Sequence, residues 1–183
     1  KFKKHHLYIK EQINERYWSC IKGAFVDDYV SGKNNVTRHA NIFALLFDYT
    51  SEERKKQIIK NVIYNKEITP ITTPYFEFFE LDAMCKIGDF KYVTDMLDSY
   101  FLGMLRLGAT TIWEEFDPKK SGIEHYEMYG GKYEKSLCHA WGASPIYLLG
   151  KYALGVMPTD VGFKSYIVKP NLMGFGEIEG HVP

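Results

Sequence analysis

The sequence contains a short stretch whose residue types suit chemistry on a sugar ring. Residues 108–114 are Gly-Ala-Thr-Thr-Ile-Trp-Glu, so Glu114 directly follows Trp113 and is itself followed by Glu115. The C–H face of a sugar packs on an aromatic ring, whereas its hydroxyls and its anomeric carbon need carboxylates. Trp113 and Glu114 together therefore indicate an acid or base that acts beside a carbohydrate.

This stretch begins a long polar and aromatic segment, residues 110–143, which also carries His139 and Trp141 near its end. A loop of this length inside a compact helical domain is usually functional. If the loop folds back on itself, the carboxylate of Glu114, the imidazole of His139 and the indoles of Trp113 and Trp141 would converge. The alternative interpretation places both indoles in the core and leaves the acids in solvent.

The elements that must hold this loop are predicted to be helices joined by short turns. Apolar residues recur at helical spacing in segments of about residues 7–17, 40–47, 52–63, 74–88, 92–105 and 144–154. Thr37 or a neighbour can cap the second segment, and Thr50 or Ser51 can cap the third. Pro74 suits the first turn of the next helix, and Gly88 suits its end.

The distribution of apolar residues predicts two layers of helices. They form a single stripe on residues 52–63 but cover more than one face of residues 75–87. Helices buried on two sides need an outer layer that covers them. We therefore predict a mainly α fold of the toroid or solenoid type, with β structure beginning near Phe163.

Composition excludes several classes of function. The chain has 183 residues, enough for about one domain, and its 23 Lys and Arg balance its 23 Asp and Glu. This balance does not indicate a nucleic-acid partner or an anionic membrane. Cys20, Cys85 and Cys138 lack metal-ligand spacing, so we expect no metal site and no organic cofactor. No apolar run is long enough for a transmembrane helix.

Both termini are predicted to be cut ends of a larger protein. A helical pattern begins almost at the first residue, and the chain stops inside the predicted β structure. The basic start, residues 1–6, is not followed by the apolar stretch of a signal peptide. Cytoplasmic and periplasmic or secreted locations both stay open.

Three separate segments resemble a known enzyme family. Residues 108–114 resemble the G-A-T-T-x-W-E segment of bacterial α-L-rhamnosidases, glycoside hydrolase family 78. Residues 136–139, Ser-Leu-Cys-His, are similar to the S-L-x-H segment that follows it in that family. Residues 155–170 resemble the passage from the family's last toroid helix into its C-terminal β domain. The resemblance is firmest between about residues 74 and 172.

The resemblance implies part of an (α/α)6 toroid. Residues 1–160 would form the C-terminal half of the catalytic toroid, and residues 161–183 would begin a C-terminal β-sandwich domain. The implied activity is hydrolysis of terminal α-L-rhamnosides with inversion. A rhamnose-containing glycoside or oligosaccharide, and the remainder of the parent chain, would then be its partners.

The resemblance also implies roles for individual residues. Glu114 matches the family's general base, which deprotonates the attacking water, and burial against Trp113 would raise its pKa. His139 would hydrogen-bond the sugar, while Trp113 and Trp141 would shape the pocket. Glu115 would support Glu114 or exchange roles with it. The family's general acid lies in the earlier half of the toroid and has no match here, so this chain alone is expected to be inactive.

The sequence departs from the family pattern in three places. Cys138 stands where the family often has Asn, Ala140 and Trp141 replace an aromatic-small pair, and residues 1–35 match only loosely.

Two other functions are compatible with the same residues. A different toroid glycosidase or a polysaccharide lyase would keep the fold and change the substrate. A lyase needs a Tyr or His base and a cation for a uronate, for which the candidates are Tyr126, Tyr129, Tyr133 and Arg106. A non-catalytic carbohydrate-binding domain would use the same aromatics, and its acids would only accept hydrogen bonds.

Overall fold

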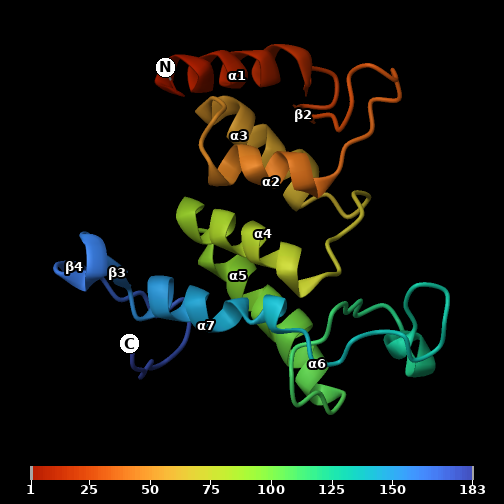
Figure 1. The fold of residues 1–183 in the computed structure, drawn as a ribbon, viewed down its shortest axis with the longest axis vertical. Coiled ribbons are helices and arrows are strands. Elements are labelled where there is room, and N and C mark those ends of the chain that lie inside the picture. Colours follow the sequence, from red (N-terminus) through yellow and green to blue (C-terminus); the bar gives the residue numbers. More distant parts are fainter. Residues whose placement is uncertain (1, 183) are drawn as a thin grey trace. The chain divides into compact units, whose positions relative to one another are not determined.

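Helices are the main secondary structure of the chain. The computed structural model describes residues 2–182 and falls into two units, Lys1–Ile71 and Thr72–Pro183, each with its own core (Figure 1). The predicted mainly α class, with few short strands, is confirmed. Among the described residues, no helix has both the length and the apolar character needed to cross a bilayer.

The first unit pairs a two-stranded ribbon with helices. Its elements are α1 (Phe2–Arg16), β1 (Trp18–Ser19), β2 (Ala24–Phe25), α2 (Arg38–Leu46), α3 (Glu52–Ile58) and the π-helical turn η1 (Ile59–Ile63). The strands are antiparallel, with Trp18 opposite Phe25. The buried Asn41 side chain on α2 accepts from the Phe25 N–H at 2.8 Å and donates to its carbonyl at 2.9 Å. This amide therefore holds the ribbon on α2.

The two predicted helix caps in this unit differ. Ser51 caps α3, because its side chain accepts from the Arg54 N–H. Thr37 occupies the N-cap position of α2, but its hydroxyl donates to Asp27 Oδ1 at 2.7 Å and makes no capping bond. Thr37 thus fastens the preceding loop instead of the helix.

The second unit contains the longer run of elements. These are α4 (Pro74–Ile87), α5 (Phe90–Met96), η2 (Leu97–Phe101), α6 (Leu102–Arg106), η3 (Gly122–Tyr126), η4 (Ala140–Gly142), α7 (Ser144–Leu148), η5 (Leu149–Ala153), β3 (Val156–Pro158), η6 (Val161–Phe163) and β4 (Tyr166–Val168). α5, η2 and α6 follow one another without a break, as do α7 and η5.

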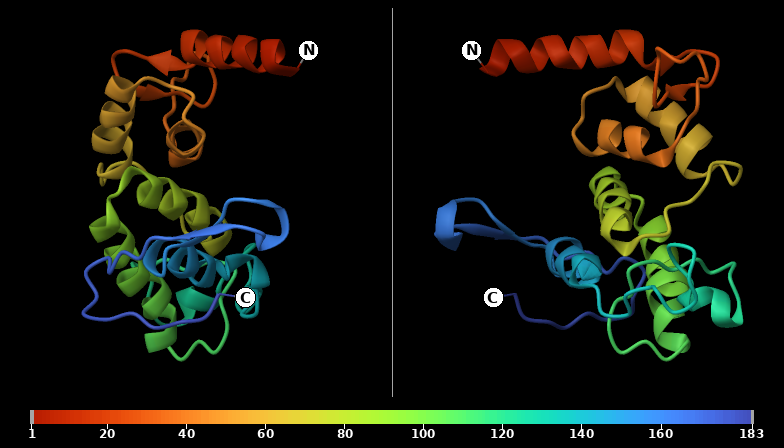
Figure 2. Two further views of the ribbon diagram at one scale, coloured as in Figure 1. Left: turned by 90° about the vertical axis from the view of Figure 1, so that its left-hand side faces the viewer. Right: turned by 45° about the vertical axis from the view of Figure 1, so that its right-hand side comes forward.

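Helix α4 is the centre of this unit. It packs against both α5 and α7, which matches the two-sided burial that its apolar residues predict. Pro74 stands in its first turn, and Gly88 ends it with a φ of 91°, a left-handed conformation that glycine adopts without a Cβ penalty. The C-terminal antiparallel pair β3–β4 extends away from these helices (Figure 2).

Candidate active site

The long loop between α6 and α7 is closed by hydrogen bonds between its two ends. The Glu114 N–H donates to the Ser136 carbonyl at 2.9 Å, and the His139 N–H donates to the Ile112 carbonyl at 2.8 Å. The segments around residues 112–114 and 136–139 therefore run side by side. This pairing brings Glu114 and His139 to one place, as expected for a loop that folds back on itself.

The closed loop is fixed to the start of α4. The Phe116 N–H donates to the Thr72 carbonyl at 2.8 Å, and the same carbonyl accepts from the buried Tyr100 hydroxyl at 2.7 Å. At the other end, a Cβ on Gly142 would come within 2.6 Å of atoms of both Ile112 and Pro74. Only glycine lets the chain pass so close to the helix start.

Both oxygens of the half-buried Glu114 carboxylate are held by neighbours. Oε1 accepts from the Tyr129 hydroxyl at 2.5 Å, and Oε2 accepts from the Ser136 N–H at 3.1 Å. The Tyr129 bond, then the Ser136 bond, lowers the pKa of Glu114, and His139 and Lys135 act in the same direction. The expected rise in pKa is therefore wrong, because the donors to the anion outweigh burial.

The adjacent Glu115 faces the opposite way, into the core. It is 7% exposed and forms ion pairs with Lys120, at 3.1 Å, and with Lys135. The Lys135 side chain is fully buried, and its ammonium also donates to the His125 carbonyl at 2.6 Å. Successive residues of an extended segment point to opposite sides, which accounts for the different surroundings of the two acids.

The two indoles also differ. Trp113 is 3% exposed and packs on Phe116 and Tyr126, with ring centroids 6.2 and 5.6 Å away. Trp141 is 70% exposed, with its ring 5.1 Å from that of Tyr75 and 6.3 Å from the imidazole of His139. The ring of Trp141 is therefore accessible to a ligand, whereas Trp113 is part of the core on which the loop packs.

Sequence reasoning missed the residues that hold Glu114. Tyr129 was a candidate only as a lyase base, and nothing in its spacing links it to a carboxylate 15 positions earlier. The lyase candidate Arg106 instead pairs with Asp98 at 2.6 Å. Within residues 2–182, no group of three or more His, Cys, Asp or Glu side chains is placed to hold a metal ion.

Helical hairpins that carry a carboxylate, an imidazole and an exposed indole on one closed loop define a helical domain of the glycosidase type. The chain belongs to the bacterial α-L-rhamnosidase six-hairpin glycosidase domain family, whose model matches residues 1–153. The resemblance recognised in the sequence is thereby confirmed, and so is the fold class, a part of an (α/α)6 toroid.

Solved structures share this fold. A glycoside hydrolase family 78 rhamnosidase of Bacillus sp. GL1 superposes with a TM-score of 0.75 and 24% identity, over 91% of this chain and 17% of that one. A rhamnosidase from Klebsiella oxytoca, solved with rhamnose bound, gives 0.71 and 23%, over 82% of this chain and 28% of that one. The chain therefore spans less than a third of either relative. No curated protein matches the sequence.

Proposed function

We propose that the chain is part of an inverting α-L-rhamnosidase in which Glu114 is the general base. The observation that carries this proposal is the Glu114 carboxylate, which two donors hold on the closed loop beside His139. The lyase alternative lacks such support, since Arg106, the cation that a lyase would use, is paired with Asp98.

The surroundings of Glu114 suit a base that must be ionised. A lowered pKa keeps its carboxylate charged at neutral pH. Each of its oxygens has two lone pairs, of which one accepts the bond from Tyr129 or Ser136. The other lone pair is available to the attacking water, whose proton Glu114 takes as the water oxygen bonds to the anomeric carbon.

The other half of the reaction needs an acid that protonates the departing oxygen. In an inverting enzyme the two carboxyl groups stand about 6.5–9.5 Å apart, which leaves room for the water. We place this acid in a part of the six-hairpin domain outside residues 1–183. The small share of the solved relatives that the chain spans supports this assignment.

The remaining residues would bind the sugar or support the loop. The exposed face of Trp141 would pack on the C–H face of a rhamnosyl unit, and His139 would hydrogen-bond its hydroxyls. Trp113 is buried and packs against Tyr126, so it would support the loop that carries Glu114. Residues 161–183 would begin a C-terminal β-sandwich domain, with β4 as one of its first strands.

The test is hydrolysis of an aryl α-L-rhamnoside by the intact parent protein, with NMR detection of the first anomer released. We expect the inverted anomer, and we expect no turnover by the chain of residues 1–183 alone. Release of the retained anomer, or turnover by the isolated chain, would contradict the mechanism. Rhamnose binding without hydrolysis would favour a binding domain, and cleavage of a uronate polymer would favour a lyase.

Tyr129→Phe should move the acidic limb of the pH dependence of kcat/KM to higher pH. The substitution removes the strongest donor to the Glu114 anion, so the pKa of Glu114 rises and the ionised base is lost earlier as the pH falls. The measurement is the pH profile for an aryl α-L-rhamnoside in the parent protein. Tyr133→Phe, on the same loop and equally exposed, is the matched control. An unchanged acidic limb in Tyr129→Phe would show that this limb does not report the protonation of Glu114.

A further inference from the structure

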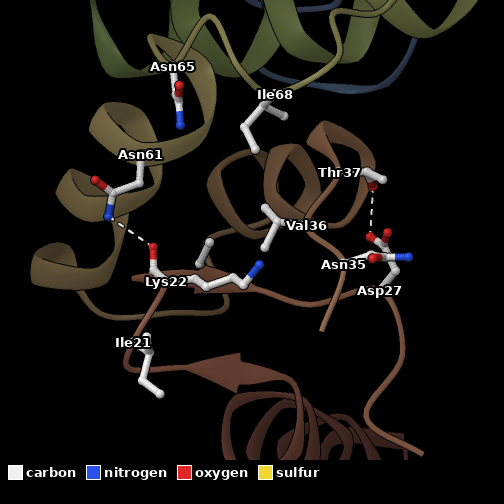
Figure 3. A pocket seen from close by; sticks show the side chains of 10 residues that line it. Ile21, Lys22, Asp27, Asn35, Val36, Thr37, Asn61, Asn65 and Ile68 are labelled. Carbon is white, nitrogen blue, oxygen red and sulfur yellow. Dashed lines mark hydrogen bonds between the residues drawn. The ribbon is translucent and has the colours of Figure 1, made fainter. Parts of the chain in front are cut away.

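The first unit contains a pocket of about 640 Å³ whose residues take no part in the candidate active site. Its polar lining consists of Lys22, Asp27, Asn35, Thr37, Asn61 and Asn65. Figure 3 shows Asn65 and Ile68 directed into the hollow from one side, while the Lys22 side chain extends across the opposite side. The volume falls within the range of about 300–1,000 Å³ that is typical of pockets for small ligands.

Hydrogen bonds within the unit shape the walls of this pocket. The loop before α2 is closed by the Asp27 N–H, which donates to the Asn35 carbonyl at 2.9 Å, and by the bond from Thr37 to Asp27. The Asn61 amide on η1 donates to the Lys22 and Gly23 carbonyls at 3.2 and 3.4 Å (Figure 3). The pocket is therefore preformed by segments that are distant in sequence.

These internal bonds leave polar atoms available. Within the described chain, Asp27 Oδ2, Asn61 Oδ1 and the Asn35 amide have no hydrogen-bond partner. Asn65 accepts from the Glu67 N–H through Oδ1, which leaves its NH₂ group as a donor. Such alternating donors and acceptors match a ligand with several hydroxyl groups, each of which both donates and accepts.

The charges of the lining select a neutral ligand. Lys22 contributes one positive charge and Asp27 one negative charge, so neither a phosphate nor a carboxylate ligand meets an excess of opposite charge. The apolar side chains of Ile21, Val36 and Ile68 add a surface for C–H groups. We propose that this pocket is a second carbohydrate site, which binds a neutral saccharide independently of Glu114.

The test is titration of the ¹⁵N-labelled chain with L-rhamnose, D-galacturonate and inorganic phosphate, followed by NMR. L-rhamnose should shift the backbone amide of Ala24 and the side-chain amides of Asn35, Asn61 and Asn65, with a Kd on the order of 1 mM. These shifts should persist in Glu114→Gln, which distinguishes failure of this proposal from failure of the proposed catalytic function. Stronger binding of galacturonate or phosphate here, shifts confined to residues 107–143, or no shifts would overturn the proposal.

Two variants remove ligand contacts while sparing the bonds that shape the pocket. Asn35→Ala and Lys22→Met replace exposed side chains that make no hydrogen bond within the described chain, so the fold should be kept. Each should weaken L-rhamnose binding about fivefold, the effect of one lost hydrogen bond. Lys56→Met, exposed on α3 outside the pocket, is the matched control. Unchanged affinity in both pocket variants would also overturn the proposal.

Discussion

Glu114→Gln should lower kcat for an aryl α-L-rhamnoside by a factor of about 10² or more in the intact parent protein. A carboxamide keeps the size of the carboxylate but cannot take the proton of the attacking water. The loop should hold its shape, because the carboxamide oxygen can accept from the Ser136 N–H while its NH₂ group donates to the Tyr129 hydroxyl. Rhamnose binding and thermal unfolding should therefore change little.

The matched control for this variant is Glu134→Gln. Glu134 lies on the same loop and is exposed, and none of its hydrogen bonds reaches the Glu114 carboxylate. It should retain full kcat. Wild-type turnover by Glu114→Gln would remove Glu114 from the role of base, and a loss of rhamnose binding that accounts for the whole decrease would assign it to binding.

Glu115→Gln should instead destabilise the protein. The substitution leaves the fully buried ammonium of Lys135 without its carboxylate, and breaking a buried ion pair in this way costs about 3–5 kcal/mol. Lys120, at 3.1 Å from the same carboxylate, loses its partner as well. Urea unfolding followed by tryptophan fluorescence measures the effect, since Trp113 is buried in the same unit.

A double variant tests whether the loss of stability comes from the unpaired charge of Lys135. Glu115→Leu with Lys135→Met replaces both charges by apolar side chains and should recover most of the stability that Glu115→Gln loses. Lys91→Met removes an exposed ion pair with Asp95 on α5 and should leave unfolding nearly unchanged. A stable Glu115→Gln variant without activity would transfer the catalytic role from Glu114 to Glu115.

Local sequence signals predicted the helices and their ends. Ser51 caps α3, Pro74 stands in the first turn of α4 and Gly88 ends it, because each residue acts on backbone within one turn of itself. The two-sided apolar pattern of residues 75–87 likewise predicted that α4 needs neighbours on both sides. Thr37 does not cap α2 as predicted, because its hydroxyl donates to a tertiary partner, Asp27.

The sequence by itself determined the family and the loop that carries the candidate site, through the composition and order of residues 108–114 and 136–139. Only the tertiary structure decided which of the two adjacent acids faces outward and which indole is exposed. It also decided that the pKa of Glu114 falls, since the donors Tyr129 and Ser136 lie 15 and 22 positions away. Hydrogen bonds and burial act through space, so neighbours in sequence can have opposite surroundings once the loop has closed.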